Sequence, residues 1–372
     1  MTTVLDQQLV LEELHVPDYE RVIKVTHEQA GLTAIISIHN RSLGKVSMGG
    51  TRIYPYASFD DALTDVLRLS KGMTYKSALA ECPWGGAKSC IILDPKKGLS
   101  REMLHAFAEA LNVLQGIYIC AEDVGCSPDT LAIVAEKTPF VVGLSHDRSS
   151  GNPSPFTAWG VFRGIQAVMY TLFNTDSVAG RTIAIQGVGS VGSKLAEYLF
   201  WHGAKLILTD RNMDVAEKLG HEFGAKVVSP DEIFDEPCDV FAPCALGGVI
   251  NEKTLERLRC RAVAGATNNP LLTENDGEAL MRAGILYAPD FVINGGGLIN
   301  VTCETVERGY NPLESRNQID KIYDQIRLIF DIAQKNHIST QRAALRLGDY
   351  RLQYGVGRRT KLVYLHHADL SY

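Results

Sequence analysis

A glycine-rich turn between an apolar run and a helical pattern most constrains the fold of this chain. Thr182–Gln186 is apolar and rich in β-branched residues, and Gly187, Gly189 and Gly192 follow it in a Gly-x-Gly-x-x-Gly arrangement. Asp210 ends the next apolar run, 18 residues after Gly192. A strand, a phosphate-binding turn, a helix and a ribose-binding acid produce this pattern in dinucleotide sites. The spacing therefore predicts a doubly wound α/β domain that binds a dinucleotide.

Each glycine of the turn is required for a different structural reason. Gly187 permits the tight turn, Gly189 lets the backbone approach a pyrophosphate, and Gly192 lets the helix pack close to the strand. The first N–H groups of that helix and its partial positive charge then face the phosphates. The cofactor-binding residues expected from the turn are Gly187, Val188, Gly189, Ser190, Val191 and Gly192.

The acid after the turn predicts which dinucleotide binds. Asp210 can accept hydrogen bonds from the adenosine ribose, and its charge would repel a 2′-phosphate, which favours NAD over NADP. Arg211 follows it directly and could tolerate that phosphate. We therefore count both residues as cofactor-binding and leave the strictness of the preference open.

Composition excludes several classes of protein. A length of 372 residues is enough for two domains, and a net charge of −6 disfavours nucleic acid as a partner. No apolar run approaches the ~20 residues of a membrane span, and the N-terminus lacks the features of a signal peptide. None of the eight cysteines forms Cys-x-x-Cys or pairs with histidine at zinc-ligand spacing. We expect a cytoplasmic protein without a metal or a membrane partner.

The glycine turn begins near the middle of the chain, so the preceding half needs a role of its own. Leu32–Ile38 and Ser89–Leu93 read as strands, and Ser58-x-x-Asp61 resembles a helix cap. Asp147–Pro155 is the clearest break. We expect an α/β catalytic and oligomerisation domain over residues 1–146 and a Rossmann domain over residues 147–335, with a cleft between the two. Residues 336–372 are expected to pack back on the first domain.

Apolar runs alternate with helical stretches beyond the turn. This βαβ series predicts a parallel, doubly wound sheet. Ser315 begins an amphipathic pattern that predicts one core-facing helix through Ala333. The expected strands are Lys226–Val228, Val240–Ala242, Ala262–Ala264 and Ile285–Tyr287.

Two charged residues of the first half are candidates for proton transfer. Lys88 lies between the glycine turn of Gly85-Gly86-Ala87 and the strand Ser89–Leu93, where partial desolvation would favour the neutral amine. Asp123 follows the short strand Ile117–Cys120, where α/β proteins often gather ligands. The alternative for each is an ordinary charged residue on a surface loop.

Six further motifs occur in order along the chain: Gly49–Arg52, Gly72–Lys76, Ala121–Gly125, Gly151–Pro155, Ala242–Gly247 and Tyr287–Asp290. Together they resemble the leucine, valine and phenylalanine branch of the amino-acid dehydrogenases, which is related to glutamate dehydrogenase. The resemblance covers most of the chain and implies the same domain order, with the catalytic half first and the NAD-binding half second.

The resemblance implies roles for individual residues. Lys76 would bind the substrate α-carboxylate, Lys88 would act as acid and base on the water that attacks the iminium carbon, and Asp123 would assist proton transfer at the amino group. Gly49 and Gly50 would line the substrate pocket. Contacts to the cofactor or substrate would come from Thr157, Asn268 and Asn294, although Asn268-Asn269 can also be read as a simple turn.

The implied side-chain pocket is apolar and of medium size, formed by Met48, Ala121, Leu298 and Val301. It favours leucine, valine or isoleucine and lacks the cation that glutamate would need. The Met48 side chain is flexible enough to admit an aromatic ring, so phenylalanine remains an alternative substrate. The implied reaction is NAD-dependent, reversible oxidative deamination of a branched-chain L-amino acid to the 2-oxo acid, ammonia and NADH, in a homo-oligomer (octamer or dimer).

One alternative belongs to another class: a regulatory NAD-binding protein without catalysis. Pro83-Trp84 is unusual for the family, and Ala87 stands where it usually has glycine. Ala87 would matter if that position needed a positive φ. The presence of Lys76, Lys88 and Asp123 favours the enzyme.

Overall fold

The computed structural model describes residues 2–4, 9–146, 148–359, 361–368 and 370–371. The chain divides into two compact units, which we describe separately. Unit 1 comprises Met1–Gly151, Val301–Asn311 and Tyr350–Tyr372, and unit 2 comprises Asn152–Asn300 and Pro312–Asp349. The chain thus returns to unit 1 twice, and the last 37 residues are shared between the units.

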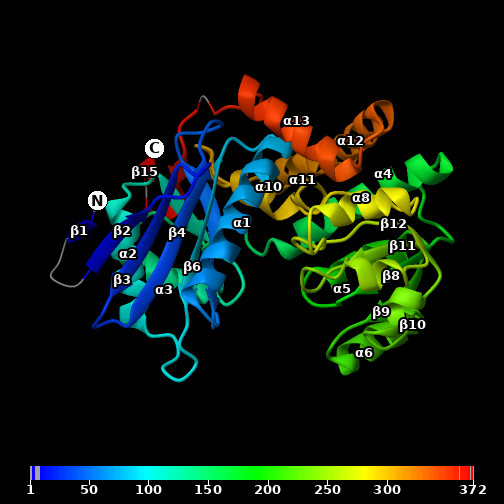
Figure 1. The fold of residues 1–372 in the computed structure, drawn as a ribbon, viewed down its shortest axis with the longest axis horizontal. Helices are drawn as coiled ribbons and strands as arrows, with labels where there is room; N and C mark the ends of the chain where they lie inside the picture. Colours follow the sequence, from blue (N-terminus) through cyan, green and yellow to red (C-terminus); the bar gives the residue numbers. More distant parts are fainter. Residues whose placement is uncertain (1, 5–8, 147, 360, 369, 372) are drawn as a thin grey trace. The chain divides into compact units, whose positions relative to one another are not determined.

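A mixed seven-stranded sheet forms the centre of unit 1 (Figure 1). Neighbours from β1 to β6 are antiparallel, whereas β5 is parallel to both β6 and β7. The three parallel strands therefore end at the same edge, which is where ligands gather in α/β sheets. In spatial order the strands are β1 (Thr2–Val4), β2 (Leu9–Leu14), β3 (Arg21–His27), β4 (Leu32–Asn40), β6 (Gly85–Ile92), β5 (Ser47–Tyr54) and β7 (Tyr118–Ala121).

Helix α1 (Phe59–Leu79) packs along β4 and β6 of this sheet. It begins at the predicted cap, because the Ser58 hydroxyl accepts a hydrogen bond from the Asp61 N–H at 3.0 Å. Ala62 and Val66 bury their side chains with Ile35 of the sheet. The helix carries Lys76 in its last turn. Two further helices of this unit are α2 (Arg101–Val113) and α3 (Pro128–Ala135).

The prediction of a glycine turn before Lys88 was wrong, because Gly85–Ile92 is one continuous strand, β6. Lys88 pairs with Ser37 of β4 in the register of the sheet, and Ala87 has no positive φ. Close packing, and not a turn, explains why residue 86 is glycine: a Cβ on Gly86 would overlap with the backbone of Thr74 in α1. Alanine at position 87 is therefore compatible with the backbone.

A six-stranded parallel sheet forms the centre of unit 2. Its order places the first two crossovers on one side of β8 and the later strands on the other, which is the Rossmann arrangement. The predicted doubly wound sheet is confirmed, and its switch point lies between β8 and β11. In spatial order the strands are β10 (Lys226–Val227), β9 (Lys205–Thr209), β8 (Thr182–Gln186), β11 (Cys238–Pro243), β12 (Cys260–Val263) and β13 (Leu286–Tyr287).

Helices connect and cover the strands of unit 2. The helix predicted from Ser315 is interrupted at Lys321, so that α11 and α12 replace one continuous element. Its apolar face is nevertheless buried as expected, including Ile319, Ile326 and Ile329. The helices in chain order are α4 (Ser154–Phe173), α5 (Gly192–Trp201), α6 (Met213–Phe223), α7 (Glu252–Leu255), α8 (Asn275–Arg282), α9 (Asp290–Ile293), α10 (Gly296–Thr302), α11 (Pro312–Asp320), α12 (Ile322–Asn336) and α13 (Thr340–Tyr354).

The C-terminal residues from Tyr350 pack on the core of unit 1. The Arg351 guanidinium is buried and donates to the carbonyls of Ala78 and Leu79 at the end of α1. Arg359 lies over the ring of buried Trp84, 4.6 Å from its centroid, directly before β6. This segment therefore supports the ends of the two elements that carry Lys76 and Lys88. It ends in β14 (Tyr364–Leu365) and β15 (Leu370–Ser371).

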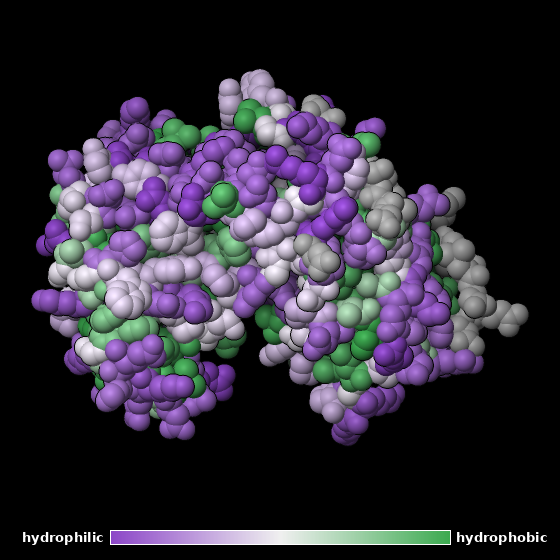
Figure 2. All heavy atoms as spheres, turned by 180° about the vertical axis from the view of Figure 1, so that it is seen from behind, coloured by the Kyte–Doolittle hydropathy of each residue, from purple (hydrophilic) through white to green (hydrophobic). Residues whose placement is uncertain are grey.

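Hydrophilic residues predominate on the face shown in Figure 2, with hydrophobic ones in scattered patches. Across the described ranges, no helix is long and apolar enough to cross a membrane. Within the same ranges, no cluster of His, Cys, Asp and Glu is arranged to hold a metal ion. All eight cysteines of the chain are free thiols.

Candidate active site

The glycine turn of unit 2 joins β8 to α5. Gly187 has a φ of 95°, which favours glycine strongly. A Cβ on Gly192 would overlap with the Gly187 carbonyl oxygen, whereas a Cβ on Gly189 would meet no atom within 4 Å. The turn is thus tight at its ends and open at Gly189, the geometry that lets a pyrophosphate approach the backbone.

Asp210 is fixed beside this turn at the end of β9. Its carboxylate accepts hydrogen bonds from the N–H of Val188 at 2.8 Å and from the N–H of Asn212 at 2.9 Å. Arg211 is exposed next to it. The acid predicted to bind the ribose is therefore anchored to the turn predicted to bind the phosphates.

The two glycines offer a matched pair of substitutions. Gly192→Ala should destabilise unit 2, because the new methyl overlaps with Gly187, and we expect a cost of about 2–4 kcal/mol in unfolding. Gly189→Ala should leave the thermal midpoint unchanged and weaken NAD binding about tenfold or more, because its methyl occupies the space left for the ligand. Thermal unfolding and NAD titration of both variants check this, and equal effects in both assays would contradict it.

Three polar residues predicted to contact ligands also lie in unit 2. The Asn294 amide donates to Asn268 Oδ1 at 2.8 Å and to the Ala266 carbonyl at 3.1 Å. Asn294 Oδ1 is buried without a hydrogen-bond partner among the described residues, so it can accept from a ligand. Thr157 lies near the start of α4 against Gly297. Asn268 is exposed and precedes Asn269, which has a φ of 51°, so a turn is present here as well.

Unit 1 brings Lys88 and Asp123 into direct contact. Their side chains form an ion pair and are only 10% and 11% exposed. Gly50 lies beside them: a Cβ there would come within 2.8 Å of Asp123 Cβ and 3.1 Å of Lys88 Nζ. Strand β6, the loop after β7 and strand β5 thus bring an amine, a carboxylate and a closely packed glycine together.

Electrostatics keep the Asp123 carboxylate ionised. Burial alone would raise the pKa of Asp123, but the positive charges of Lys88 and Arg52 outweigh it and lower the pKa to about 2. Burial and the Asp123 charge instead raise the pKa of neighbouring Glu122. Lys88 therefore faces a permanent negative charge at any pH at which the protein would be assayed.

The other predicted substrate residues lie on β5, β7, α1 and α10. Gly50 pairs with Ala121 at the end of β7, and a Cβ on Gly49 would overlap with the Ala87 carbonyl. Met48 is buried in β5, and Lys76 is half-buried in α1. Helix α10 carries Leu298 of unit 2 and Val301 of unit 1. The roles of all these residues remain predictions.

The sequence did not predict three further polar residues, of which Arg52 contacts Asp123 and the other two continue from Arg52. Arg52 lies 3.5 Å from Asp123 and 2.9 Å from Asp65, and Tyr56 donates to Asp65 at 2.6 Å. Arg52 follows Gly50 by two positions in β5, so both residues face the same side of the strand. That alternation is the signal that could have placed Arg52 at the site.

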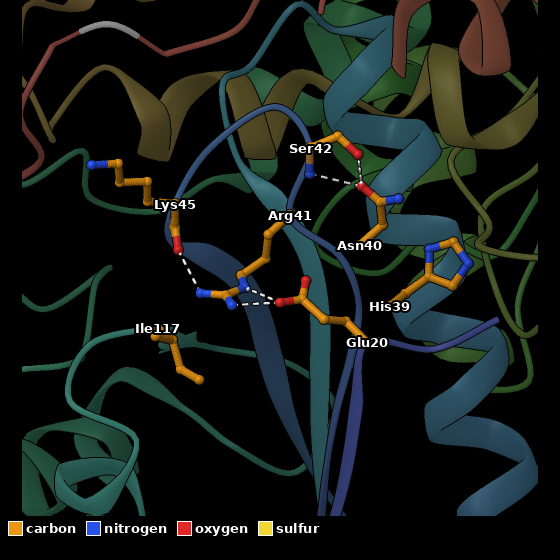
Figure 3. A pocket seen from close by; sticks show the side chains of 7 residues that line it. All are labelled: Glu20, His39, Asn40, Arg41, Ser42, Lys45 and Ile117. Atoms are coloured by element: carbon orange, nitrogen blue, oxygen red, sulfur yellow. Dashed lines mark hydrogen bonds and ion pairs between the residues drawn. The ribbon is translucent and has the colours of Figure 1, made fainter. Parts of the chain in front are cut away.

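A hollow of about 710 Å³ also occurs in unit 1, at the loop between β4 and β5 (Figure 3). Arg41 crosses it, pairs with Glu20 and donates to the Lys45 carbonyl at 2.8 Å. Asn40 accepts from the Ser42 N–H at 2.8 Å. These polar groups satisfy one another, and the residues lining the hollow do not include Lys88 or Asp123.

Comparisons with known proteins give a consistent result. The family described as "Glu/Leu/Phe/Val dehydrogenase, dimerisation domain" matches residues 19–140, and "Glutamate/Leucine/Phenylalanine/Valine dehydrogenase" matches residues 207–353. The chain is 45% identical over 349 residues to a leucine dehydrogenase of Thermoactinomyces intermedius, covering 94% of each chain. It is 41% identical to a phenylalanine dehydrogenase of Caldalkalibacillus thermarum, covering 91% of this chain and 92% of that one.

A solved structure resembles most of the chain. The crystal structure of L-tryptophan dehydrogenase from Nostoc punctiforme matches with a TM-score of 0.78 and 39% identity, and the match covers 91% of this chain and 97% of that one. The similarity thus includes both units and is not limited to the dinucleotide-binding fold.

Proposed function

Because this chain belongs to the glutamate/leucine/phenylalanine/valine dehydrogenase family, we propose that it catalyses the reversible oxidative deamination of a branched-chain L-amino acid with NAD. The products are the 2-oxo acid, ammonia and NADH. The observation that carries the proposal is the buried ion pair of Lys88 and Asp123 beside Gly50. A regulatory NAD-binding protein without catalysis would have no need to bury that pair.

The chemistry assigns a task to each charged residue of unit 1. The Lys76 ammonium binds the substrate α-carboxylate. Lys88 accepts a proton from the water that attacks the iminium carbon, and Asp123 assists proton transfer at the departing amino group. In the reverse direction the same groups return these protons. Asp123 also stabilises the ammonium that Lys88 becomes after it has accepted the proton.

The residues of unit 2 fit a dinucleotide. The open backbone at Gly189, the N-terminus of α5 and the anchored Asp210 match its phosphates and ribose. Asn294 Oδ1, buried without a partner among the described residues, is a further acceptor for it or for the substrate. When bound, the nicotinamide takes up the hydrogen and electron pair that leave the substrate Cα.

The predicted pocket supports an aliphatic substrate. Met48 and Ala121 present only apolar side chains beside Gly50, which suits leucine, valine or isoleucine better than glutamate. Relatives named for phenylalanine and tryptophan make an aromatic substrate the alternative. Initial rates of NADH formation with L-leucine, L-valine, L-phenylalanine, L-tryptophan and L-glutamate decide between them. Turnover with glutamate alone would refute the inference of an aliphatic pocket. Turnover with none of the five amino acids would refute the proposed dehydrogenase activity.

Cofactor choice gives a second prediction. Asp210→Asn should keep the hydrogen bond from Val188 and lose the charge that repels a 2′-phosphate, so the NADP-to-NAD ratio of kcat/KM should rise about tenfold or more. Adding Arg211→Ala should reverse most of this gain, because the arginine is the cation available to that phosphate. Steady-state rates with both cofactors check it, and an unchanged ratio in Asp210→Asn would contradict it.

Assembly and location belong to the same proposal. We expect a homo-oligomer, an octamer or a dimer, and the description of residues 19–140 as a dimerisation domain supports this. Eight free thiols are typical of proteins from a reducing compartment, which supports the cytoplasm. Light scattering coupled to size-exclusion chromatography measures the subunit number directly.

A further inference from the structure

Charges of alternating sign continue behind Asp123 in unit 1. Arg52 of β5 reaches two carboxylates: its Nη1 donates to Asp65 Oδ2 at 2.9 Å, and its Nη2 lies 3.5 Å from Asp123 Oδ1. The Tyr56 hydroxyl donates to the same Asp65 oxygen at 2.6 Å. The order Tyr56, Asp65, Arg52, Asp123, Lys88 therefore connects helix α1 with the reacting amine.

This row of charges is poorly screened. The side chains of Lys88 and Asp123 are about one-tenth exposed, and those of Arg52 and Asp65 are 18% and 28% exposed. Water and salt weaken interactions much less at such positions than at the surface. A change of charge at Arg52 or Asp65 will therefore change the electrostatic potential at the Lys88 amine.

We propose that Arg52, held in place by Asp65, is a positioning residue that orients the Asp123 carboxylate and sets how tightly Lys88 holds its proton. The inference rests on the proposed function of Lys88 and Asp123. A planar guanidinium suits this task, because its fork can serve one carboxylate on each side, which a lysine ammonium cannot do with the same rigidity.

The sign of each effect follows from the order of charges. Removing the Arg52 charge leaves Asp123 neutralised by Lys88 alone, so Lys88 holds its proton more tightly. Removing the Asp65 charge has the opposite result, because Arg52 then acts on Asp123 without competition and Lys88 releases its proton more easily. Two neighbouring variants should thus move Lys88 in opposite directions.

Other titratable groups surround the pair and stay constant in these variants. Burial raises the pKa of Tyr56 and of the two thiols nearest the row, so that these groups are neutral at the pH of an assay. Glu122, whose pKa is also raised, adjoins Asp123. Besides Tyr56 and Asp65, which belong to the row, the groups that face it from β6 and from the segment after β7 are Cys90, Glu122 and Cys126.

The test is the pH profile of kcat/KM for oxidation of the preferred amino acid. Arg52→Gln should lower the maximum about 10- to 100-fold and raise the midpoint of the rising limb by about one pH unit. Asp65→Asn should lower that midpoint. Arg52→Lys should restore the midpoint but not the whole rate, because it keeps the charge and loses the fork.

Arg21→Gln is the matched control. Arg21 pairs with Glu13 across β2 and β3 of the same sheet, so this variant also breaks an arginine–carboxylate pair. Its profile should coincide with that of the wild type. An unmoved midpoint in Arg52→Gln, or a shift of the same sign in Arg52→Gln and Asp65→Asn, would overturn the proposal even if the rates fell.

A second readout does not depend on turnover. Reductive methylation of the Lys88 amine is followed by mass spectrometry in the intact protein at a series of pH values. Its rate reports the protonation state of that amine, because only the neutral amine reacts. The midpoints should rank Arg52→Gln above wild type and wild type above Asp65→Asn. Loss of this ranking would refute the role of Arg52, whereas the correct ranking in a protein without deaminase activity would refute only the proposed function. If Arg52→Gln does not fold, Asp65→Asn alone still gives the sign.

Discussion

Lys88→Ala is expected to lose amino-acid oxidation by about 10³-fold or more while NAD still binds. The amine is the base at the reacting carbon in the proposed chemistry, and alanine removes it while Asp123 keeps Arg52 as its ion-pair partner. The glycine turn and Asp210 lie in unit 2, so their affinity for NAD should not change. Initial rates with saturating L-leucine, together with titration of NAD by fluorescence, measure the two effects separately.

Lys97→Ala is the matched control for this variant. Lys97 is an exposed lysine in the loop that follows β6, so its removal tests for a general effect of lost positive charge. It should retain wild-type rates. A Lys88→Ala enzyme that keeps more than about a tenth of the wild-type rate would contradict the role of Lys88 as the acid and base.

Asp123→Asn is expected to reduce the rate about 10²- to 10³-fold without a large change of shape. Asparagine fills the same space but leaves the Lys88 ammonium without its counter-charge and cannot take up a proton. Because the Asp123 pKa is about 2, the carboxylate is ionised above about pH 4. The loss should therefore be present at every pH of the assay range and should not be rescued by raising the pH.

The control for Asp123→Asn is Asp60→Asn, which removes an exposed carboxylate from the first turn of α1. It should leave kcat unchanged. An Asp123→Asn enzyme that recovers the wild-type rate at alkaline pH would show that Asp123 only tunes Lys88 and transfers no proton, in contradiction to the proposed role.

Much of unit 2 could be predicted from the sequence. A parallel sheet buries both faces, so its strands are short apolar runs that stand out between helices, and the glycine turn fixes which of them is β8. The conformation of the turn could be predicted as well, because φ and close packing at Gly187 and Gly192 permit little other than glycine, and the binding of the cofactor by its residues stays a prediction. Local chemistry was sufficient there.

Other features depend on contacts that the sequence does not display. The sequence predicts a turn at Gly85 and Gly86, whereas Gly86 in fact permits the close approach of α1 to β6, a contact between distant segments. No proline or glycine lies at the break at Lys321 between α11 and α12, so the sequence does not predict it. Arg52 and Asp65 lie 13 positions apart, and only the packing of α1 on the sheet brings them together.

The central claim is that Lys88 and Asp123 support oxidative deamination, and the stoichiometry of a single reaction tests it most directly. Purified protein is incubated with NAD and a limiting amount of L-leucine, and NADH, ammonia and the 2-oxo acid are each quantified at completion. The proposed function predicts one equivalent of all three for each leucine consumed, and none of them with Lys88→Ala. NADH without ammonia, or no NADH from any of the five amino acids, would contradict it.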